Sequence, residues 1–234
     1  MDAPQPTAPQ RPHVLLSAAM SIDGYLDDAS PERLLLSNAA DFDRVDELRA
    51  DCDAILAGST TLRRDNPQLL VNDPARQAAR TATGRPAHPL KVTLSATGNL
   101  PADLRFWHTG GAKVAYATDA AAPALRAALD GLAEVVALGP RVRLAALLDD
   151  LGRRGVRRLL VEGGGSVHTQ FLAEGLADEL QLAVAPLLVG DPAAPRFVNP
   201  ADFPGGSTRR MRLLEARTVG DVVLLRYAPK EHSA

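Results

Sequence analysis

The chain has 234 residues, of which 46% are hydrophobic and 23% charged, the composition of a globular protein with one large domain or two small ones. Its net charge of −2 gives no overall field that would attract nucleic acid or an anionic membrane. The single cysteine, Cys52, excludes a disulfide framework, and no apolar run reaches the ~20 residues of a membrane span. We therefore expect a cytoplasmic protein whose partner is a small molecule.

The two ends of the chain differ from the rest. Residues 1–11 are rich in proline and lack the basic start and apolar middle of a signal peptide, so we expect a disordered tail. Residues 12–228 contain no internal repeat or linker and are expected to form one domain, with a second tail at residues 229–234.

The first predicted strand is the apolar run of residues 14–20, which leads directly into Asp23-Gly24. Ligands of α/β sheets bind at the carboxyl ends of strands, so Asp23 is a candidate catalytic residue of a cleft. The alternative is a turn aspartate that hydrogen-bonds nearby backbone N–H groups.

A helical period follows in residues 37–52, where Ser37 or Asn38 can serve as the N-cap. No basic activator stands beside Cys52, so we expect it in the core and not as a nucleophile. The apolar positions with this spacing are Phe42, Val45, Leu48 and Cys52.

The next strand, residues 54–57, ends at a segment rich in hydroxyl groups, residues 58–69. These hydroxyls either hold phosphate or ribose or cap a short helix that stops at Pro67. Residues 72–90 are rich in Asn, Pro, Arg and Ala and are expected to form a mobile excursion with about one helical turn. Further strands are expected at residues 91–95, 114–116 and 135–138, with helices at residues 123–132 and 144–151.

The most informative stretch is residues 159–171, in which an apolar run is followed by Glu162, three glycines and a helical pattern from Ser166. Glycines allow a close approach of backbone to ligand, and a helix N-terminus favours phosphate. The alternative is a strand-to-helix connection that needs small residues for packing alone. The P-loop and G-x-G-x-x-G motifs are both excluded, since no Gly-Lys-Ser/Thr occurs and His168 replaces the third glycine. We expect His168 on the helix surface.

Residues 180–185 alternate as a strand, and residues 211–218 and 222–227 flank a glycine turn as a hairpin. The chain is therefore predicted to be a single α/β domain, with a mixed, mostly parallel central sheet flanked by helices and a C-terminal antiparallel hairpin.

Four blocks of sequence, in this order, indicate a family. They are residues 20–24 (MSIDG), 58–69 (GSTTLRRDNPQL), 161–165 (VEGGG) and 185–190 (APLLVG). The chain resembles the pyrimidine reductases of riboflavin biosynthesis, whose fold is that of dihydrofolate reductase. The resemblance implies reduction, with NADPH, of a ribosylaminopyrimidine 5′-phosphate of the 5-amino-6-ribosylaminouracil type to a ribitylamino product. It also implies a protein that is commonly a homodimer.

The resemblance also implies roles for individual residues. Asp23 and Glu162 would be catalytic, and Glu162 would contact the substrate together with Leu69 and Arg49, the expected phosphate ligand. The implied cofactor contacts are Ala19, Thr61, Asp65, Ser95, Gly163, Gly164, Gly165, Ser166 and Val167, with Ser95 near the adenosine 2′-phosphate.

Two departures from the family pattern keep alternatives open. Ser17 and Asn72 stand where many members have a lysine and a phosphate-binding arginine. One alternative is therefore a dihydrofolate-reductase-like enzyme with another pterin, C=N or C=O substrate. A second is a catalytically silent protein that binds a nucleotide.

Relatives often have a zinc deaminase domain ahead of the reductase. Here 11 residues precede Pro12, and neither His-x-Glu nor Cys-x-x-Cys occurs. We expect a stand-alone reductase without a metal.

Overall fold

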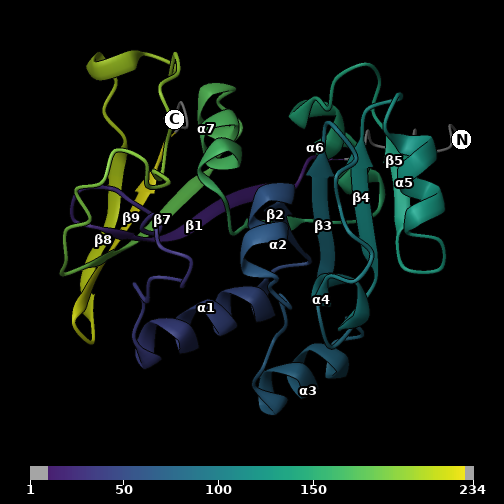
Figure 1. Cartoon of the computed structure of the whole chain (residues 1–234). Coiled ribbons are helices and arrows are strands. Elements are labelled where there is room, and N and C mark those ends of the chain that lie inside the picture. Colours follow the sequence, from purple (N-terminus) through teal and green to yellow (C-terminus); the bar gives the residue numbers. More distant parts are fainter. Residues whose placement is uncertain (1–9, 230–234) are drawn as a thin grey trace, which may run out of the picture.

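The computed structural model describes residues 10–229 as one layered α/β structure (Figure 1). A nine-stranded sheet with the order β5-β4-β3-β2-β6-β1-β7-β9-β8 runs through it, as predicted. All pairs from β5 to β7 are parallel, and β9 pairs antiparallel with both β7 and β8. The strands are β1 (His13–Ser21), β2 (Ala54–Gly58), β3 (Leu90–Ser95), β4 (Lys113–Ala117), β5 (Glu134–Ala137), β6 (Arg158–Val161), β7 (Glu179–Ala185), β8 (Arg212–Val219) and β9 (Val222–Ala228).

Helices connect the parallel strands. They are α1 (Ala39–Asp51), α2 (Ser59–Asp65), α3 (Pro74–Ala82), α4 (Arg105–His108), α5 (Ala122–Ala128), α6 (Leu144–Arg153) and α7 (Gly165–Ala173), with a 3-10 turn at Gly206–Thr208. Since none of the described helices is long and apolar enough, the structure contains no candidate membrane span within residues 10–229.

The strand residues alternate between two hydrophobic cores, because successive side chains of a strand point to opposite faces of a sheet. On β1, Val14 and Leu16 pack with α6 and α7, whereas Leu15 packs on the other face with residues of α4 and α5. Both faces of the parallel strands are therefore covered, which explains why these strands are apolar runs.

The predicted apolar face of α1 is partly wrong. Asn38 caps the helix by accepting a hydrogen bond from the Asp41 N–H, and Cys52 is fully buried, as expected. However, Phe42 is 49% exposed, and the buried side of the helix includes Asp41, Arg44 and Asp46. These side chains are buried because they pair with one another or with neighbouring polar groups, as the Arg44–Asp41 ion pair at 2.7 Å does.

Residues 72–90 are not a mobile excursion, because they contain the ordered helix α3. Asp73 caps it by accepting hydrogen bonds from the N–H groups of Ala75 and Arg76. The guanidinium of Arg80 is buried and donates to the carbonyls of Ala50 and Cys52. The Arg-rich composition thus reflects side chains that fasten this helix to α1 and not a solvated loop.

Two residues of the predicted N-terminal tail contact the domain. Arg11 forms an ion pair of 2.5 Å with Asp149, and a Cβ on Gly152 would meet the Gln10 carbonyl at 2.7 Å, so residues 10 and 11 pack on α6. The remainder of the two predicted tails, residues 1–9 and 230–234, lies outside the described residues.

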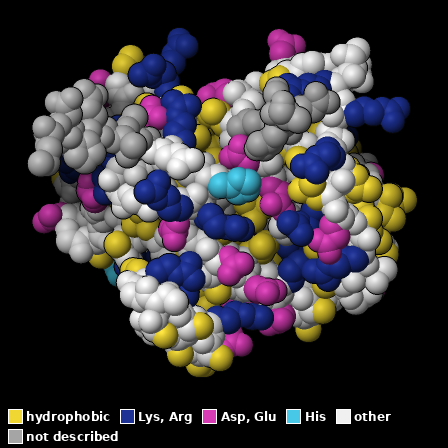
Figure 2. Space-filling view, turned by 180° about the vertical axis from the view of Figure 1, so that it is seen from behind, with side chains coloured by type: hydrophobic (Ala, Val, Ile, Leu, Met, Phe, Trp, Pro, Cys, Tyr) yellow, Lys and Arg dark blue, Asp and Glu magenta, His cyan; other side chains and the backbone are white. Residues whose placement is uncertain are grey.

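At the other end of the sheet, β8 is an edge strand with exposed apolar side chains, including Leu213 at 54% and Leu214 at 39%. On the face seen in Figure 2, acidic and basic side chains are interspersed, without a broad field of one sign.

Candidate active site

A cavity of about 760 Å³ opens at the carboxyl ends of the parallel strands. Its wall includes residues of β1 and of the loops that follow β1, β2, β3, β4, β5 and β6. This is the edge at which open α/β sheets bind their ligands. The cavity therefore defines the site against which the predicted residues can be compared.

The glycine turn lies on this wall with all five of its predicted residues, Gly163, Gly164, Gly165, Ser166 and Val167. Helix α7 begins at Gly165, one residue earlier than predicted, and no side chain caps it. In the described part of the chain, the N–H groups of Gly165 and Ser166 have no acceptor. Free N–H groups and the positive end of a helix dipole together form a site for phosphate.

The same glycines are also required for packing. A Cβ on Gly164 would lie 2.9 Å from Thr61 Oγ1, and one on Gly165 would lie 2.1 Å from the Arg196 carbonyl oxygen. Gly163 has a φ of 139°, which L-residues rarely adopt. The two interpretations of the glycines are therefore compatible, because the same residues pack closely and line the cavity.

Three further predicted cofactor residues, Ala19, Thr61 and Asp65, lie on the cavity wall. Ala19 comes from β1, and the other two from α2, directly after β2. Burial raises the pKa of the Asp65 carboxyl, although Arg33 and Arg64 oppose part of this effect. Asp65 is thus a partly buried acid beside a cavity suited to a ligand.

Glu162 also lies on the wall, and Arg49 holds its carboxylate from the side of α1. Arg49 Nε donates to Glu162 Oε1 and Nη2 to Oε2, both at 2.7 Å. A third donor, Nη1, is 3.1 Å from the Leu70 carbonyl. Arg49 does not line the cavity, and its guanidinium holds Glu162 through a bidentate pair.

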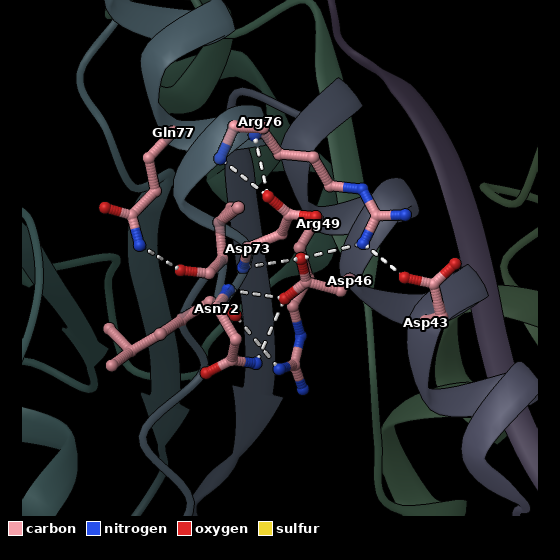
Figure 3. A network of polar contacts seen from close by, with 10 residues as sticks. Asp43, Asp46, Arg49, Asn72, Asp73, Arg76 and Gln77 are labelled. Carbon is pink, nitrogen blue, oxygen red and sulfur yellow. Dashed lines mark hydrogen bonds and ion pairs between the residues drawn. The ribbon is translucent and has the colours of Figure 1, made fainter.

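Arg49 belongs to a polar network between α1 and α3 (Figure 3). Asp46, one turn before Arg49, accepts hydrogen bonds from the backbone and side-chain nitrogens of Asn72. It also forms an ion pair of 3.1 Å with Arg76. Asn72 is therefore a structural partner of Asp46, and neither it nor the buried Ser17 lines the cavity. These two departures from the family pattern do not alter the wall itself.

Asp23 does not lie on the cavity wall. Its carboxylate accepts hydrogen bonds from Ser21 Oγ at 2.6 Å and from the N–H groups of Val189 and Gly190 at 3.1 and 2.8 Å. These hydrogen bonds, chiefly that from Ser21, lower the pKa of Asp23. These contacts fit the turn alternative, and a catalytic role of Asp23 stays a prediction.

Two other predicted site residues are buried away from the wall. Leu69 is 4% exposed and packs in the core that contains Phe106 and Trp107. Ser95 is 2% exposed, and its hydroxyl accepts a hydrogen bond from Gly98 N–H at 3.0 Å. Neither side chain lines the cavity.

His168 is not a surface residue of α7. It is 1% exposed, its ring lies 5.2 Å from that of Phe197, and burial lowers its pKa to about 4. Helical periodicity missed this burial because the loop that contains Phe197 covers α7 only in the tertiary structure.

The sequence reasoning also missed the basic side chains of the cavity wall, Arg33, Arg64, Arg141 and Arg196. Arg64 pairs with Asp27 at 2.9 Å, and Arg196 lies over the Tyr25 ring at 4.6 Å. Arg64 lies in α2 and the other three in separate loops, without a shared motif, so no pattern in the sequence marked them as a group.

Together, a mostly parallel sheet, a cavity at its strand ends and a free helix N-terminus define an α/β protein with a site suited to a phosphate-bearing ligand. The family model of the RibD C-terminal domain matches residues 12–225, and the chain belongs to this family. The dihydrofolate-reductase-like fold expected from the sequence is thereby confirmed, since solved structures of RibD share it.

The chain is similar over its length to two archaeal enzymes named 2,5-diamino-6-ribosylamino-4(3H)-pyrimidinone 5′-phosphate reductase. The Archaeoglobus fulgidus protein is 32% identical over 90% of this chain and 95% of its own, and that of Methanothermobacter thermautotrophicus is 32% identical over 94% and 99%. Acinetobacter baumannii RibD superposes with a TM-score of 0.78 at 27% identity, over 94% of this chain. This chain spans 58% of that RibD chain.

Proposed function

We propose that this protein is an NADPH-dependent reductase that converts a ribosylaminopyrimidine 5′-phosphate to its ribitylamino product in riboflavin biosynthesis. One observation carries the proposal: Ala19, Thr61, Asp65, Glu162 and the glycine turn line a single cavity in a chain of the RibD C-terminal domain family. The family resemblance supplies the reaction, and the geometry of the cavity supports the roles that we propose for its residues.

The glycine turn and the α7 N-terminus would hold the diphosphate of NADPH, whose dihydronicotinamide supplies a hydride when bound. Reduction of the open-chain C1′=N bond of the substrate adds the hydride to carbon and a proton to nitrogen. Glu162, fixed by Arg49, is placed to bind and orient the substrate. Asp65, whose pKa is raised by burial, is the wall residue best suited to hold the proton.

For the substrate phosphate, Arg33 replaces Arg49 as the proposed ligand. Arg33 lies on the wall in an exposed loop after β1, and its charge acts on Asp65, but its side chain makes no hydrogen bond or salt bridge to a described residue. Its fork is therefore free to bind phosphate oxygens, whereas that of Arg49 is committed to Glu162.

The base of the substrate is proposed to be the diamino form, before deamination. From the family resemblance we expected the aminouracil form of the base. However, the relatives that this chain matches over nearly their full length are named for the diaminopyrimidinone.

The test is to follow NADPH oxidation by the purified full chain with the diamino compound, the aminouracil compound and dihydrofolate in parallel. The proposal expects turnover of a ribosylaminopyrimidine phosphate, fastest with the diamino form, and a product that mass spectrometry shows to have gained two hydrogens. Turnover of dihydrofolate alone would show that the proposed substrate is wrong. If neither NADPH nor NADH binds, the reductase assignment is wrong.

We further propose a cytoplasmic homodimer that associates through the C-terminal hairpin. The support is the exposed apolar edge strand β8, with Leu213 and Leu214 and the preceding Met211, since unpaired apolar edges are normally covered. Light scattering measures the mass directly. A monomer at micromolar concentration contradicts the proposal, and Leu213→Lys is expected to shift a dimer toward monomer.

A further inference from the structure

The part of the cavity farthest from Glu162 in the strand order is formed by the loops after β3, β4 and β5. Hydrogen bonds join these three loops. Thr118 Oγ1 donates to the Ala96 carbonyl at 2.9 Å, and Asp119 N–H donates to the Gly139 carbonyl at 2.9 Å. The Asp119 carboxylate accepts the Gly139 N–H in return at 3.1 Å. The three loops thus form one rim, which holds the segment that begins at Pro140.

The charges on this rim differ from those in the rest of the cavity. The carboxylates of the wall, Asp27, Asp65 and Glu162, come from the loop after β1, from α2 and from the end of β6. On the rim, Arg141 is the only charged side chain among the described wall residues. The rim residues on the wall are Leu94, Ala96, Thr118, Pro140, Arg141 and Val142.

Arg141 is also unneutralised. Its exposed side chain makes no hydrogen bond or ion pair to any residue between 10 and 229, whereas the wall residues Arg64 and Arg196 are held by Asp27 and Tyr25. The apolar wall residues beside it, Leu94, Pro140 and Val142, would suit the flat face of a base. A free arginine next to an apolar slot fits a phosphorylated nucleoside.

We infer that Arg141 binds the 2′-phosphate of NADPH and makes this chain select NADPH over NADH. The inference rests on the proposed function. With the diphosphate at the α7 N-terminus, beside β6, the adenosine would extend over β2 and β3 toward β4. From β6 to β4 the sheet spans three strand spacings of ~4.8 Å each, a distance that the adenosine half of the cofactor can cover. An acidic side chain at such a position binds the ribose diol of NAD, whereas an arginine accommodates the 2′-phosphate of NADP. Ser95, the residue expected there, is buried.

The chain contains a matched control, Arg143, which lies two residues further on and is equally charged and exposed. This residue is the N-cap of α6. Its side chain has no partner among the described residues and does not line the cavity. Substitution of either arginine by alanine changes the net charge by the same amount. A difference between the two variants therefore reports position and not general electrostatics.

The experiment measures the Kd of NADPH and of NADH for the full chain by fluorescence titration, without substrate. Arg141→Ala is expected to raise the Kd of NADPH about 10- to 100-fold, because a charge-assisted contact is lost. The Kd of NADH is expected to change by less than about 3-fold. Arg143→Ala should leave both Kd values unchanged. The Kd of NADPH for Arg141→Lys should lie between those for the wild type and Arg141→Ala.

Competition provides a second measurement, because adenosine 2′,5′-bisphosphate should displace NADPH better than AMP does from the wild type but not from Arg141→Ala. An NADPH-to-NADH ratio of Kd values that is the same in the wild type and in Arg141→Ala overturns the inference and leaves the proposed reductase intact. A wild type that binds neither dinucleotide overturns both.

Discussion

Two neighbouring turns of the sheet show how similar sequence features acquire different roles. The glycine turn follows β6 and the Asp-Gly turn follows β1, and these strands are adjacent and parallel. Each turn has a carboxylate, Glu162 or Asp23, that sequence reasoning assigns to catalysis. Glu162 faces the cavity with a guanidinium behind it, whereas Asp23 is used by the N–H groups of Val189 and Gly190. A place after a strand therefore brings a carboxylate to the ligand-binding edge of the sheet, but its hydrogen-bond partners decide whether it can act on a ligand.

The largest effect that would test this comparison is expected from Glu162→Gln. The variant loses the charge of the carboxylate that orients the substrate, and turnover should fall at least about 100-fold, the range of a lost positioning contact. The Kd for NADPH should stay close to that of the wild type, because the glycine turn is unchanged. Steady-state kinetics together with cofactor titration separate the two effects. Turnover close to that of the wild type would contradict the assigned role.

Arg49→Met should follow, with a loss of about 10- to 100-fold in kcat, because Glu162 would lose the bidentate partner that orients it. The structure makes Arg49 a positioning residue, so Arg49→Lys should recover part of the activity. Because Arg49 does not line the cavity, KM should change less than kcat. A rise in KM alone would instead restore Arg49 as the phosphate ligand.

A pH experiment separates the two turns through His168, which lies in the helix of the glycine turn. Burial lowers the pKa of His168 to about 4, below the value of about 6.5 in an unfolded chain. Its neutral form thus stabilises the fold fully above pH ~6.5, and this contribution, of order 3 kcal/mol, is lost as pH falls toward 4. Denaturant unfolding of the wild type and of His168→Leu between these limits should give a flatter pH dependence for the variant. Parallel curves would refute the effect.

The smallest effect on activity is expected from Asp23→Asn. Kinetic constants should stay within about 3-fold of the wild type, while Tm falls by a few degrees as the hydrogen bonds to Val189 and Gly190 weaken. Because the pKa of Asp23 is lowered in the fold, its contribution is present above the unfolded carboxyl range and lost as pH falls below it. A large loss of kcat at an unchanged Tm would return Asp23 to the catalytic site.

Most of the fold was predictable because its strands are continuous apolar runs and its later helices have clear periods. The wall positions of Ala19, Thr61, Asp65, Glu162 and the glycine turn were predictable for a related reason: they follow such strands in recognisable blocks. The failures on α1 and α3 share a cause. Arg44, Asp46 and Arg80 are buried against partners distant in sequence, and periodicity assigns such residues to solvent.

The sequence by itself determined the order of strands and helices, the family and the turn at which a phosphate is expected, because local periodicity and glycine chemistry encode these features. Only the tertiary structure decided which charged groups are free. Arg49 and Asp23 were committed to partners over 100 residues away, Glu162 and Val189, whereas Arg141 was left without a partner on the cavity wall. The physical reason is that a charged side chain binds a ligand only with donors or acceptors that the fold has not already used, and those partners come from other strands and loops.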